Sequence, residues 1–347
     1  MNGGERLDRR VVFAAPGEVR LEEAPVEPPR PGEILLETRQ SLISTGTELA
    51  HLVGPPWTNP GGRRLPVYPH VSGYSNAAVV LEVGDGVTAW RPGDRIASGA
   101  RHASYPRLRQ QDWAIRIPDD VSDEEATFCT LGATVLNGCR IGAPQLGEDA
   151  VVIGMGLLGQ LLAQYLRLAG CRTVIAIDLA PARLAIAERV GAATHRLNPG
   201  TDDVIAAVHN LTQGRGADVV YEVTGRTETY DLAFALARFH GRVVALGSPR
   251  RPASVDMQQV HMKALRVLGA IVASHPPEED RRNRWSRRAN GQLFMELLAG
   301  RQLNVRDLIT DRFPAAEAPR AYAQLLEERE RHLGVILDWG SGQPTIG

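Results

Sequence analysis

The stretch AVVIGMGLLGQLLAQYLRLAG, residues 150–170, decides the fold of this chain. Its apolar start predicts a strand, and residues 157–170 have the apolar spacing of a helix. Between them, Gly154, Gly156 and Gly159 fit the pattern G-x-G-x-x-G, in which a strand turns tightly into a helix. The first glycine permits the turn, the second leaves room for a pyrophosphate, and the third lets the helix pack closely on the strand. The free N–H groups at the start of that helix favour a phosphate charge.

Strands and helices continue to alternate after this motif. The alternation predicts a parallel, doubly wound sheet, that is, an α/β Rossmann unit. The expected strands are 173–178, 217–225, 241–247 and 264–273, and the expected helices include 180–191 and 227–240.

Asp178 ends the second expected strand, roughly 20 residues after Gly159, where a carboxylate that binds the ribose is expected. A carboxylate there accepts the ribose hydroxyls of NAD and repels the 2′-phosphate of NADP. Arg183 could offset that repulsion, or it could be a solvated arginine on the next helix. The pattern therefore favours NAD over NADP as the cofactor.

Composition excludes several classes of protein. The chain has 347 residues, a net charge of −1 and 43% hydrophobic residues, so it has about two domains' worth of chain and no charge field that would recruit nucleic acid or membrane. Lys263 is the only lysine, and Gln259 stands four residues before it, which excludes a Tyr-x-x-x-Lys mechanism. Three cysteines without CxxC spacing predict a reducing, cytoplasmic location.

Residues up to about 118 are rich in short strands and turns, with little helical periodicity. Ser122 followed by Glu125 then predicts a capping box at the start of a helix. The chain after residue 276 contains a charged stretch, two helical segments and two strand-like segments.

The ordered set of motifs TGTEL, VVLEVGDGV, RPGDRI, GADVVYEVTG and GRVVALGS resembles the medium-chain dehydrogenase/reductase family, the zinc alcohol dehydrogenases and their zinc-free relatives. The resemblance implies a GroES-like β-barrel catalytic domain made of residues 1–131 and 273–347. A Rossmann NAD-binding domain, residues 132–272, is inserted between those two parts. It also implies a homodimer or homotetramer.

The sequence departs from the family at the zinc positions. The resemblance places the three ligands of a catalytic zinc at Thr45, Tyr74 and Thr130. Neutral hydroxyls are poor ligands for zinc, which prefers thiolate, imidazole or carboxylate. We therefore expect no zinc, and the four-cysteine lobe of the structural zinc is absent from the sequence. An alignment shifted by one residue would bring other ligand types near a metal site, namely Cys129, Glu48, His51 and His70.

Without a metal, hydrogen-bond donors must stabilise the substrate oxygen and move its proton. The Tyr74 phenol could do so, or it could be a packed tyrosine in a turn. The resemblance gives Thr47 the position of the proton-relay hydroxyl, and His51 stands next to the relay's histidine position. For Glu48, the resemblance implies a structural role.

Several other residues complete the expected site. His70 and His102 lie in loops and are expected to face solvent. Trp57, Arg284 and Trp285 could shape the substrate pocket, although the arginine-rich stretch around Trp285 could instead be a solvated, salt-bridged face. The resemblance implies nucleotide contacts from Thr134, Leu157, Leu158, Thr224, Gly247, Ser248 and Ala270.

Three functions remain open from the sequence alone. The first is a zinc-independent, NAD-dependent dehydrogenase of a secondary alcohol, such as a sugar, cyclitol or other polyhydroxylated molecule. The second is an enone or quinone reductase, which would usually take NADPH. The third is a catalytically silent nucleotide-binding protein.

Overall fold

The computed structural model describes residues 6–54, 57–58, 64–276, 279 and 283–340. The chain divides into two compact units. Unit 1 consists of Met1–Thr130, Gly291–Arg301 and Ile309–Gly347, and unit 2 of Leu131–Asn290 and Gln302–Leu308. The chain returns to unit 1 at Gly291 and not at residue 273, the boundary expected from the sequence.

The later return has a physical reason, because Ser274 and Asn290 are bonded to α3 within unit 2. The Asn137 side chain donates to the Ser274 hydroxyl at 2.9 Å, and the Arg140 guanidinium donates to the Asn290 side chain at 3.0 Å.

Unit 2 is a doubly wound α/β fold, as predicted. Its six strands are β11 (Asp149–Ile153), β12 (Thr173–Ile177), β13 (His195–Leu197), β14 (Ala217–Glu222), β15 (Ala237–Ala245) and β16 (Arg266–Gly269). They pair in parallel in the order β13-β12-β11-β14-β15-β16. The order reverses between β11 and β14, and at such a point the carboxyl ends of the strands form a ligand-binding crevice.

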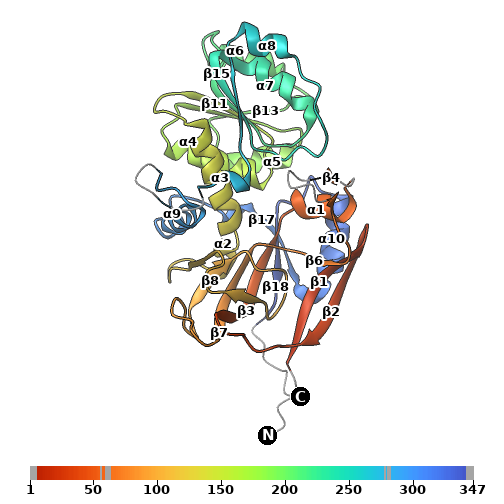
Figure 1. Cartoon of the computed structure of the whole chain (residues 1–347). Coiled ribbons are helices and arrows are strands. Elements are labelled where there is room, and N and C mark those ends of the chain that lie inside the picture. The colour runs from red at the N-terminus through yellow and green to blue at the C-terminus, as the bar shows by residue number, and fades with distance from the viewer. Residues whose placement is uncertain (1–5, 55–56, 59–63, 277–278, 280–282, 341–347) are drawn as a thin grey trace. The chain divides into compact units, whose positions relative to one another are not determined.

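Helices cover both faces of this sheet (Figure 1). As a consequence, every residue of β11 and β12 is buried. The helices are α3 (Cys129–Gly142, which begins in unit 1), α4 (Leu157–Leu168), α5 (Pro181–Arg189), α6 (Val204–Leu211), α7 (Tyr230–Leu236) and α8 (Met257–Met262). Short 3₁₀ turns add η1 (Thr227–Thr229), η2 (Val272–Ser274) and η3 (Arg306–Leu308).

The helix expected over 227–240 is shorter in the structure. It ends at Leu236, and β15 begins at the next residue. The only lysine explains the stop, since the Lys263 ammonium donates to the carbonyls of Phe234, Ala235 and Ala237 at 2.9, 2.7 and 3.0 Å. A cation that binds the last carbonyls of a helix favours termination there.

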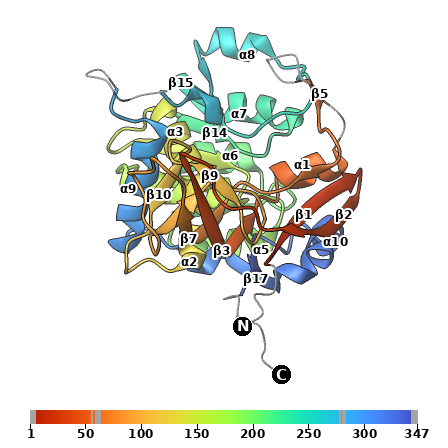
Figure 2. The ribbon, with the colours of Figure 1, turned by 60° about the horizontal axis from the view of Figure 1, so that its bottom comes forward.

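Unit 1 is rich in strands, as predicted, and its fold is consistent with a GroES-like domain. One sheet has the order β2-β1-β6, and a seven-stranded sheet has the order β10-β8-β7-β3-β18-β17, with β9 paired to β3. The long strand β3 runs beside β7 (Figure 2). The strands are β1 (Leu7–Ala15), β2 (Glu18–Pro25), β3 (Glu33–Ile43), β4 (Trp57–Thr58), β5 (Arg64–Leu65), β6 (His70–Val71), β7 (Asn76–Val83), β8 (Arg95–Ser98), β9 (Arg107–Arg109), β10 (Ala114–Arg116), β17 (Ile309–Pro314) and β18 (Gly334–Asp338).

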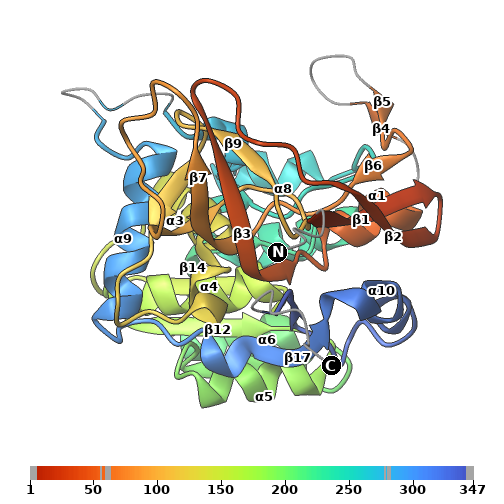
Figure 3. The ribbon, with the colours of Figure 1, turned by 90° about the horizontal axis from the view of Figure 1, so that it is seen from below.

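The helices of unit 1 include one that the residue pattern does not predict, α1 (Thr47–Val53). The capping box of Ser122 and Glu125 is confirmed, although it starts the short helix α2 (Asp123–Ala126), and α3 begins separately after it. The tail forms α9 (Arg287–Ala299, which begins in unit 2), η4 (Ala315–Glu317) and α10 (Ala318–Glu327). Helix α10 lies against β2 and α1 (Figure 3), and Leu49, Leu52, Tyr322 and Leu325 share one buried apolar cluster.

Among the described residues, no helix combines the length and apolar character needed to cross a bilayer.

Candidate active site

The glycine turn of unit 2 has the geometry that its spacing predicts. Gly154 has φ +99°, and a Cβ there would lie 2.7 Å from the Thr224 methyl group. A Cβ on Gly159 would lie 1.9 Å from the Gly154 carbonyl oxygen, which ordinary packing does not allow. Gly156 caps α4, and a Cβ on it would meet nothing within 4 Å. The turn is therefore crowded at Gly154 and Gly159 and open at Gly156, where a phosphate would lie.

Asp178 follows β12 and is held beside this turn. Its Oδ2 accepts the Met155 N–H at 2.7 Å, and its Oδ1 accepts the Ala180 N–H at 2.8 Å. The Arg183 guanidinium lies 3.8 Å from Asp178 Oδ2. Since each carboxylate oxygen has two acceptor sites, Asp178 retains acceptor capacity for the hydroxyls of a ribose.

Glu222 is a buried acid at the end of β14 that the residue pattern does not single out. Its carboxylate accepts the Thr224 and Gly225 N–H groups at 2.8 and 3.1 Å, the Thr229 hydroxyl at 2.9 Å, and the Thr224 hydroxyl. A Cβ on Gly247 would lie 2.2 Å from the Gly225 nitrogen. Glu222 and Gly247 thus fix the loop after β14. The only signal in the sequence is an acid at a strand end followed by Val-Thr-Gly, which by itself has no distinctive spacing.

The other expected nucleotide residues lie in unit 2 at these strand ends or on the adjoining helices. Ala270 follows β16 and donates its N–H to the Ala245 carbonyl at 2.9 Å. Leu157 and Leu158 begin α4, Thr134 is half-buried in α3, and Ser248 is exposed after β15.

Unit 1 contains a buried carboxylate, Glu48, which is 2% exposed. Its Oε1 accepts the Ser44 N–H at 2.8 Å. Its Oε2 accepts hydroxyl hydrogen bonds from Ser72 at 2.6 Å and Tyr322 at 2.5 Å, and lies 3.1 Å from His102 Nε2. Burial raises the pKa of Glu48, but the charge and hydrogen bond of His102 and the two hydroxyl bonds outweigh it and hold the pKa at about 2.

The expectation that His102 faces solvent is wrong. Its ring is fully buried, because Nε2 contacts Glu48 and Nδ1 lies 2.8 Å from the Ser41 hydroxyl. Trp339 donates its indole N–H to the same Ser41 hydroxyl at 2.9 Å. His102 therefore belongs to a buried polar network and has no access to substrate through solvent.

Tyr74 lies next to this network. Its half-buried phenol donates a hydrogen bond to the Ser44 hydroxyl, and its carbonyl accepts the Thr130 hydroxyl at 3.0 Å. Two of the three positions matched to zinc ligands, Tyr74 and Thr130, are thus in contact, and the third, Thr45, adjoins Ser44. Sequence reasoning missed Ser44, whose hydroxyl makes this pairing.

These residues do not fit a catalytic zinc. Thr45, Tyr74 and Thr130 offer neutral hydroxyls, and two of those hydroxyls already donate to neighbouring oxygens. Across the part of the chain that the structure describes, no group of three or more His, Cys, Asp or Glu side chains could hold a metal ion. Cys129, a ligand under a shifted alignment, is buried with its thiol 3.6 Å from the Gly291 carbonyl oxygen.

The other candidates on α1 are placed differently. Thr47 begins α1 and is half-buried. His51 lies in the last turn of α1, where its carbonyl accepts the Tyr68 hydroxyl at 2.5 Å and its ring lies 6.0 Å from the His70 ring. His70 is half-buried, and burial lowers its pKa.

The expected pocket residues are only partly described. Trp57 is in β4, but its side chain lies outside the described residues. In unit 2, the guanidinium carbons of Arg140 and Arg284 lie 3.3 and 4.5 Å from the centre of the Trp285 ring. The Trp285 ring thus already contacts two cations of the protein.

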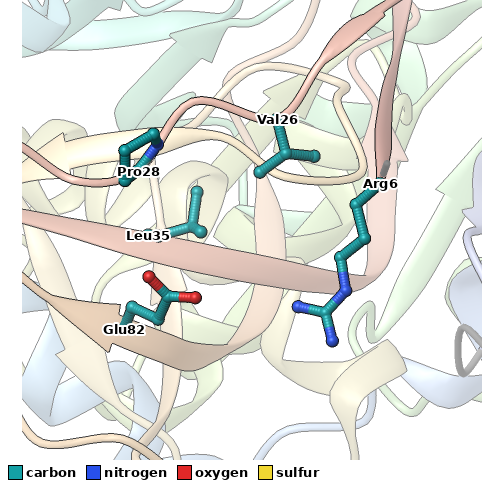
Figure 4. A pocket seen from close by; sticks show the side chains of 5 residues that line it. All are labelled: Arg6, Val26, Pro28, Leu35 and Glu82. Carbon is teal, nitrogen blue, oxygen red and sulfur yellow. The ribbon is translucent and has the colours of Figure 1, made fainter. Parts of the chain in front are cut away.

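A pocket of about 200 Å³ elsewhere in unit 1 contains none of these residues. Arg6, Val26, Pro28, Leu35 and Glu82 line it (Figure 4). It holds one basic and one acidic side chain and no nucleophile, so we assign it no part in the chemistry.

Comparisons with known proteins agree with this architecture. Residues 158–287 match the family model described as zinc-binding dehydrogenase. The chain is 27% identical to an L-threonine 3-dehydrogenase of Coxiella burnetii, over 94% of this chain and 97% of that protein. It is 24% identical to the sorbitol dehydrogenase of Mus musculus, over 92% of each.

Among solved structures, the 2R,3R-butanediol dehydrogenase of Bacillus subtilis has the same fold, with a TM-score of 0.81 and 20% identity. The match covers 96% of this chain and 100% of that one. Together with the glycine turn and the parallel six-stranded sheet, these similarities support the resemblance of the chain to the medium-chain dehydrogenase/reductase family of alcohol dehydrogenase-like proteins.

Proposed function

We propose that this protein is an NAD-dependent dehydrogenase that interconverts a secondary alcohol and its ketone without zinc. The observation that carries the proposal is the Tyr74–Ser44 hydroxyl pair, bonded together where the family resemblance places a metal ligand. The names of two relatives, an L-threonine 3-dehydrogenase and a sorbitol dehydrogenase, support the reaction class.

Unit 2 would hold the cofactor. The open side of Gly156 and the start of α4 suit the pyrophosphate, and Asp178 suits the adenosine ribose. We propose further contacts from Thr134, Leu157, Leu158, Thr224, Gly247, Ser248 and Ala270. When bound, the nicotinamide supplies or accepts a hydride. Asp178 favours NAD over NADP, although Arg183 at 3.8 Å partly offsets its charge.

Unit 1 would handle the proton. In the oxidation direction, the phenolate form of Tyr74 accepts the hydroxyl proton of the alcohol, directly or through Thr47, and becomes the phenol. In the reduction direction, the phenol gives that proton to the substrate oxygen and becomes the phenolate. The Ser44 hydroxyl orients the phenol, and the Thr45 and Thr47 hydroxyls can donate to the substrate oxygen as its negative charge develops. We propose His51, which stands next to the family's relay-histidine position, as a second candidate for moving the proton.

The substrate we propose is a sugar, cyclitol or other polyhydroxylated molecule. A site built from neutral hydroxyls matches such a substrate in hydrogen-bonding character. The sorbitol dehydrogenase relative acts on a molecule of this class by its name. Trp57, Thr130 and Arg284 are proposed to shape the pocket. Trp285 would act as the platform that holds Arg140 and Arg284.

A substrate panel tests this proposal. NAD and NADP reduction would be followed with sorbitol, galactitol, myo-inositol, 2,3-butanediol and L-threonine, and NADPH oxidation with cyclohexenone and benzoquinone. We expect turnover with a polyol and NAD. Turnover only with an enone or quinone and NADPH would show a reductase of C=C bonds or quinones. No turnover with any pair, while NADH still binds, would show a silent nucleotide-binding protein.

We also propose a homodimer or homotetramer that forms through unit 2. Among the described strands, β16 is the last in its sheet, and Met257, Met262, Val267, Ile271 and Val272 around it are exposed apolar residues. The three cysteines are buried free thiols, which suits the cytoplasm that we propose as location. Light scattering of Val267→Glu protein tests the interface, because a charge there should dissociate the oligomer.

A further inference from the structure

Glu48 is a buried charged group that the proposed chemistry does not use. We infer that Glu48 is a positioning residue, which fixes Ser44 and through it the Tyr74 phenol. This inference rests on the role proposed above for Tyr74. A positioning role differs from a purely structural one, because it requires that a substitution of Glu48 change the titration of the Tyr74 hydroxyl.

The first step is that Glu48 acts only as an acceptor. Four donors converge on its two oxygens, from the Ser44 main chain, the Ser72 and Tyr322 hydroxyls and the His102 ring. A buried carboxylate is tolerated when it is bonded in this way. An ionised Glu48 satisfies all four donors at once, and a neutral side chain cannot.

The second step concerns the direction of the hydrogen bonds behind His102. The Trp339 indole can only donate, so it donates to the Ser41 hydroxyl. The Ser41 hydroxyl can also donate to His102 Nδ1 or accept from it, so in either case a proton on His102 Nε2 faces Glu48. The donor pattern is consistent from Trp339 to Glu48, so His102 holds the carboxylate in one orientation.

The third step links Glu48 to Ser44. The Ser44 N–H donates to Glu48 Oε1 at 2.8 Å, and the Ser44 carbonyl accepts the Glu48 N–H at 2.9 Å. Both main-chain groups of Ser44 are thus bonded to the same residue, and Ser44 is 6% exposed. Its hydroxyl, which the Tyr74 phenol contacts, has little freedom to move.

The fourth step is that this link spans the sequence. Tyr322 comes from α10, His102 from the loop after β8, and Ser72 from the end of β6. These three segments hold Glu48 from different sides, while Glu48 itself stands in the first turn of α1. Helix α10 and the catalytic hydroxyls are therefore coupled through one carboxylate.

The experiment places 3-fluorotyrosine at position 74 of the full-length protein and follows its ¹⁹F resonance against pH, which requires no substrate. The Ser44 hydroxyl can turn and donate a hydrogen bond to the Tyr74 phenolate. Ser44→Ala removes that donor, so the Tyr74 phenol should titrate at a higher pH, with an ionisation constant about tenfold smaller. Glu48→Gln should raise the midpoint in the same direction, by about threefold in that constant. The double variant should equal Ser44→Ala alone.

The direction of the change separates the alternatives. Removing a nearby negative charge would by itself lower the midpoint, because an anion disfavours a phenolate. A lower midpoint, an unchanged resonance in a folded Glu48→Gln protein, or additive effects of the two substitutions would each overturn the inference. Glu82→Gln, an exposed acid in unit 1, is the matched control and should leave the resonance unchanged.

A second variant protects the test if Glu48→Gln does not fold. Tyr322→Phe removes one hydroxyl from the cluster and keeps the charge of Glu48. It should broaden or shift the ¹⁹F resonance at position 74 in the direction of Ser44→Ala, and an unmoved resonance would contradict the inference. The proposed function fails separately, if Tyr74→Phe keeps full turnover on the polyol panel.

Discussion

The two units organise their candidate sites around acids in different ways. In unit 2, Asp178 and Glu222 bind main-chain N–H groups of nearby loops, so the proposed cofactor site is formed largely by main-chain groups. In unit 1, Glu48 binds side chains that are distant in sequence, such as Tyr322 and His102. A backbone-built site depends on local spacing, whereas a side-chain-built site depends on the whole unit being folded. Substitutions in the unit 2 site and in the unit 1 site should therefore change different properties of the protein.

The largest effect is expected at Tyr74. Tyr74→Phe removes the hydroxyl proposed to transfer the proton, so kcat should fall by about 10²–10⁴-fold, the usual contribution of a general acid or base. NADH affinity, measured by fluorescence titration, should not change, because unit 2 is untouched. Tyr105→Phe, a half-buried tyrosine in unit 1, is the control. A weaker NADH affinity in Tyr74→Phe would contradict this separation of roles.

The next effect is the acid sensitivity of unit 1. Because the pKa of Glu48 is about 2 when folded and 4.5 ordinarily, its ionisation stabilises the folded state fully above pH 4.5. That stabilisation disappears as the pH falls from 4.5 to 2, and it amounts to about 3 kcal/mol.

Guanidinium unfolding at pH 6 and pH 3 measures about two thirds of this loss, because Glu48 is still mostly ionised in the folded state at pH 3. Glu48→Gln should lower stability at pH 6 and remove much of the difference between the two pH values. A wild-type and a Glu48→Gln protein with the same pH dependence would show that Glu48 does not carry it.

A smaller effect is expected from two neighbouring glycines in unit 2. Gly159→Ala should destabilise unit 2 by about 1–3 kcal/mol, since its Cβ would lie 1.9 Å from the Gly154 oxygen. Gly156→Ala should leave the stability of the protein without cofactor unchanged, because a Cβ there meets nothing, and should weaken NADH binding. Thermal unfolding with and without NADH distinguishes the two. Equal destabilisation by both substitutions would be inconsistent with this geometry.

The smallest effect concerns the choice of cofactor. Asp178→Asn removes the charge that repels a 2′-phosphate and leaves Arg183 to attract it. NADH affinity should fall by about tenfold, as expected for the loss of charged hydrogen bonds, while NADPH affinity rises. The measurement is the ratio of the dissociation constants of NADH and NADPH. An unchanged ratio would show that Asp178 does not determine the choice between these cofactors.

The sequence predicts the fold and the glycine turn of unit 2 well, because their signals are local. Gly154, Gly156, Gly159 and Asp178 lie in one strand-helix-strand segment, and their spacing alone specifies the turn. Glu222 was missed, although it too is local, because an acid at a strand end has no distinctive spacing.

The unit 1 site could be predicted only in part. The family resemblance identifies Tyr74 and Thr130, but the partners Ser44, His102 and Tyr322 come together only through tertiary packing. A loop histidine such as His102 looks solvent-exposed in sequence, and only the fold shows the buried carboxylate beside it. Helix α1 was missed for the same reason, since burial of Leu49 and Leu52 against α10 stabilises its seven residues more than their periodicity indicates.

The most direct test asks whether turnover needs zinc. The protein would be dialysed against a strong chelator, its zinc content measured by mass spectrometry, and its NAD reduction followed with the polyol that gives turnover in the panel. We predict unchanged kcat and KM with far less than one zinc per chain, and no gain when zinc is added. Activity that disappears with the chelator and returns in proportion to added zinc would contradict a hydroxyl-based site at Tyr74.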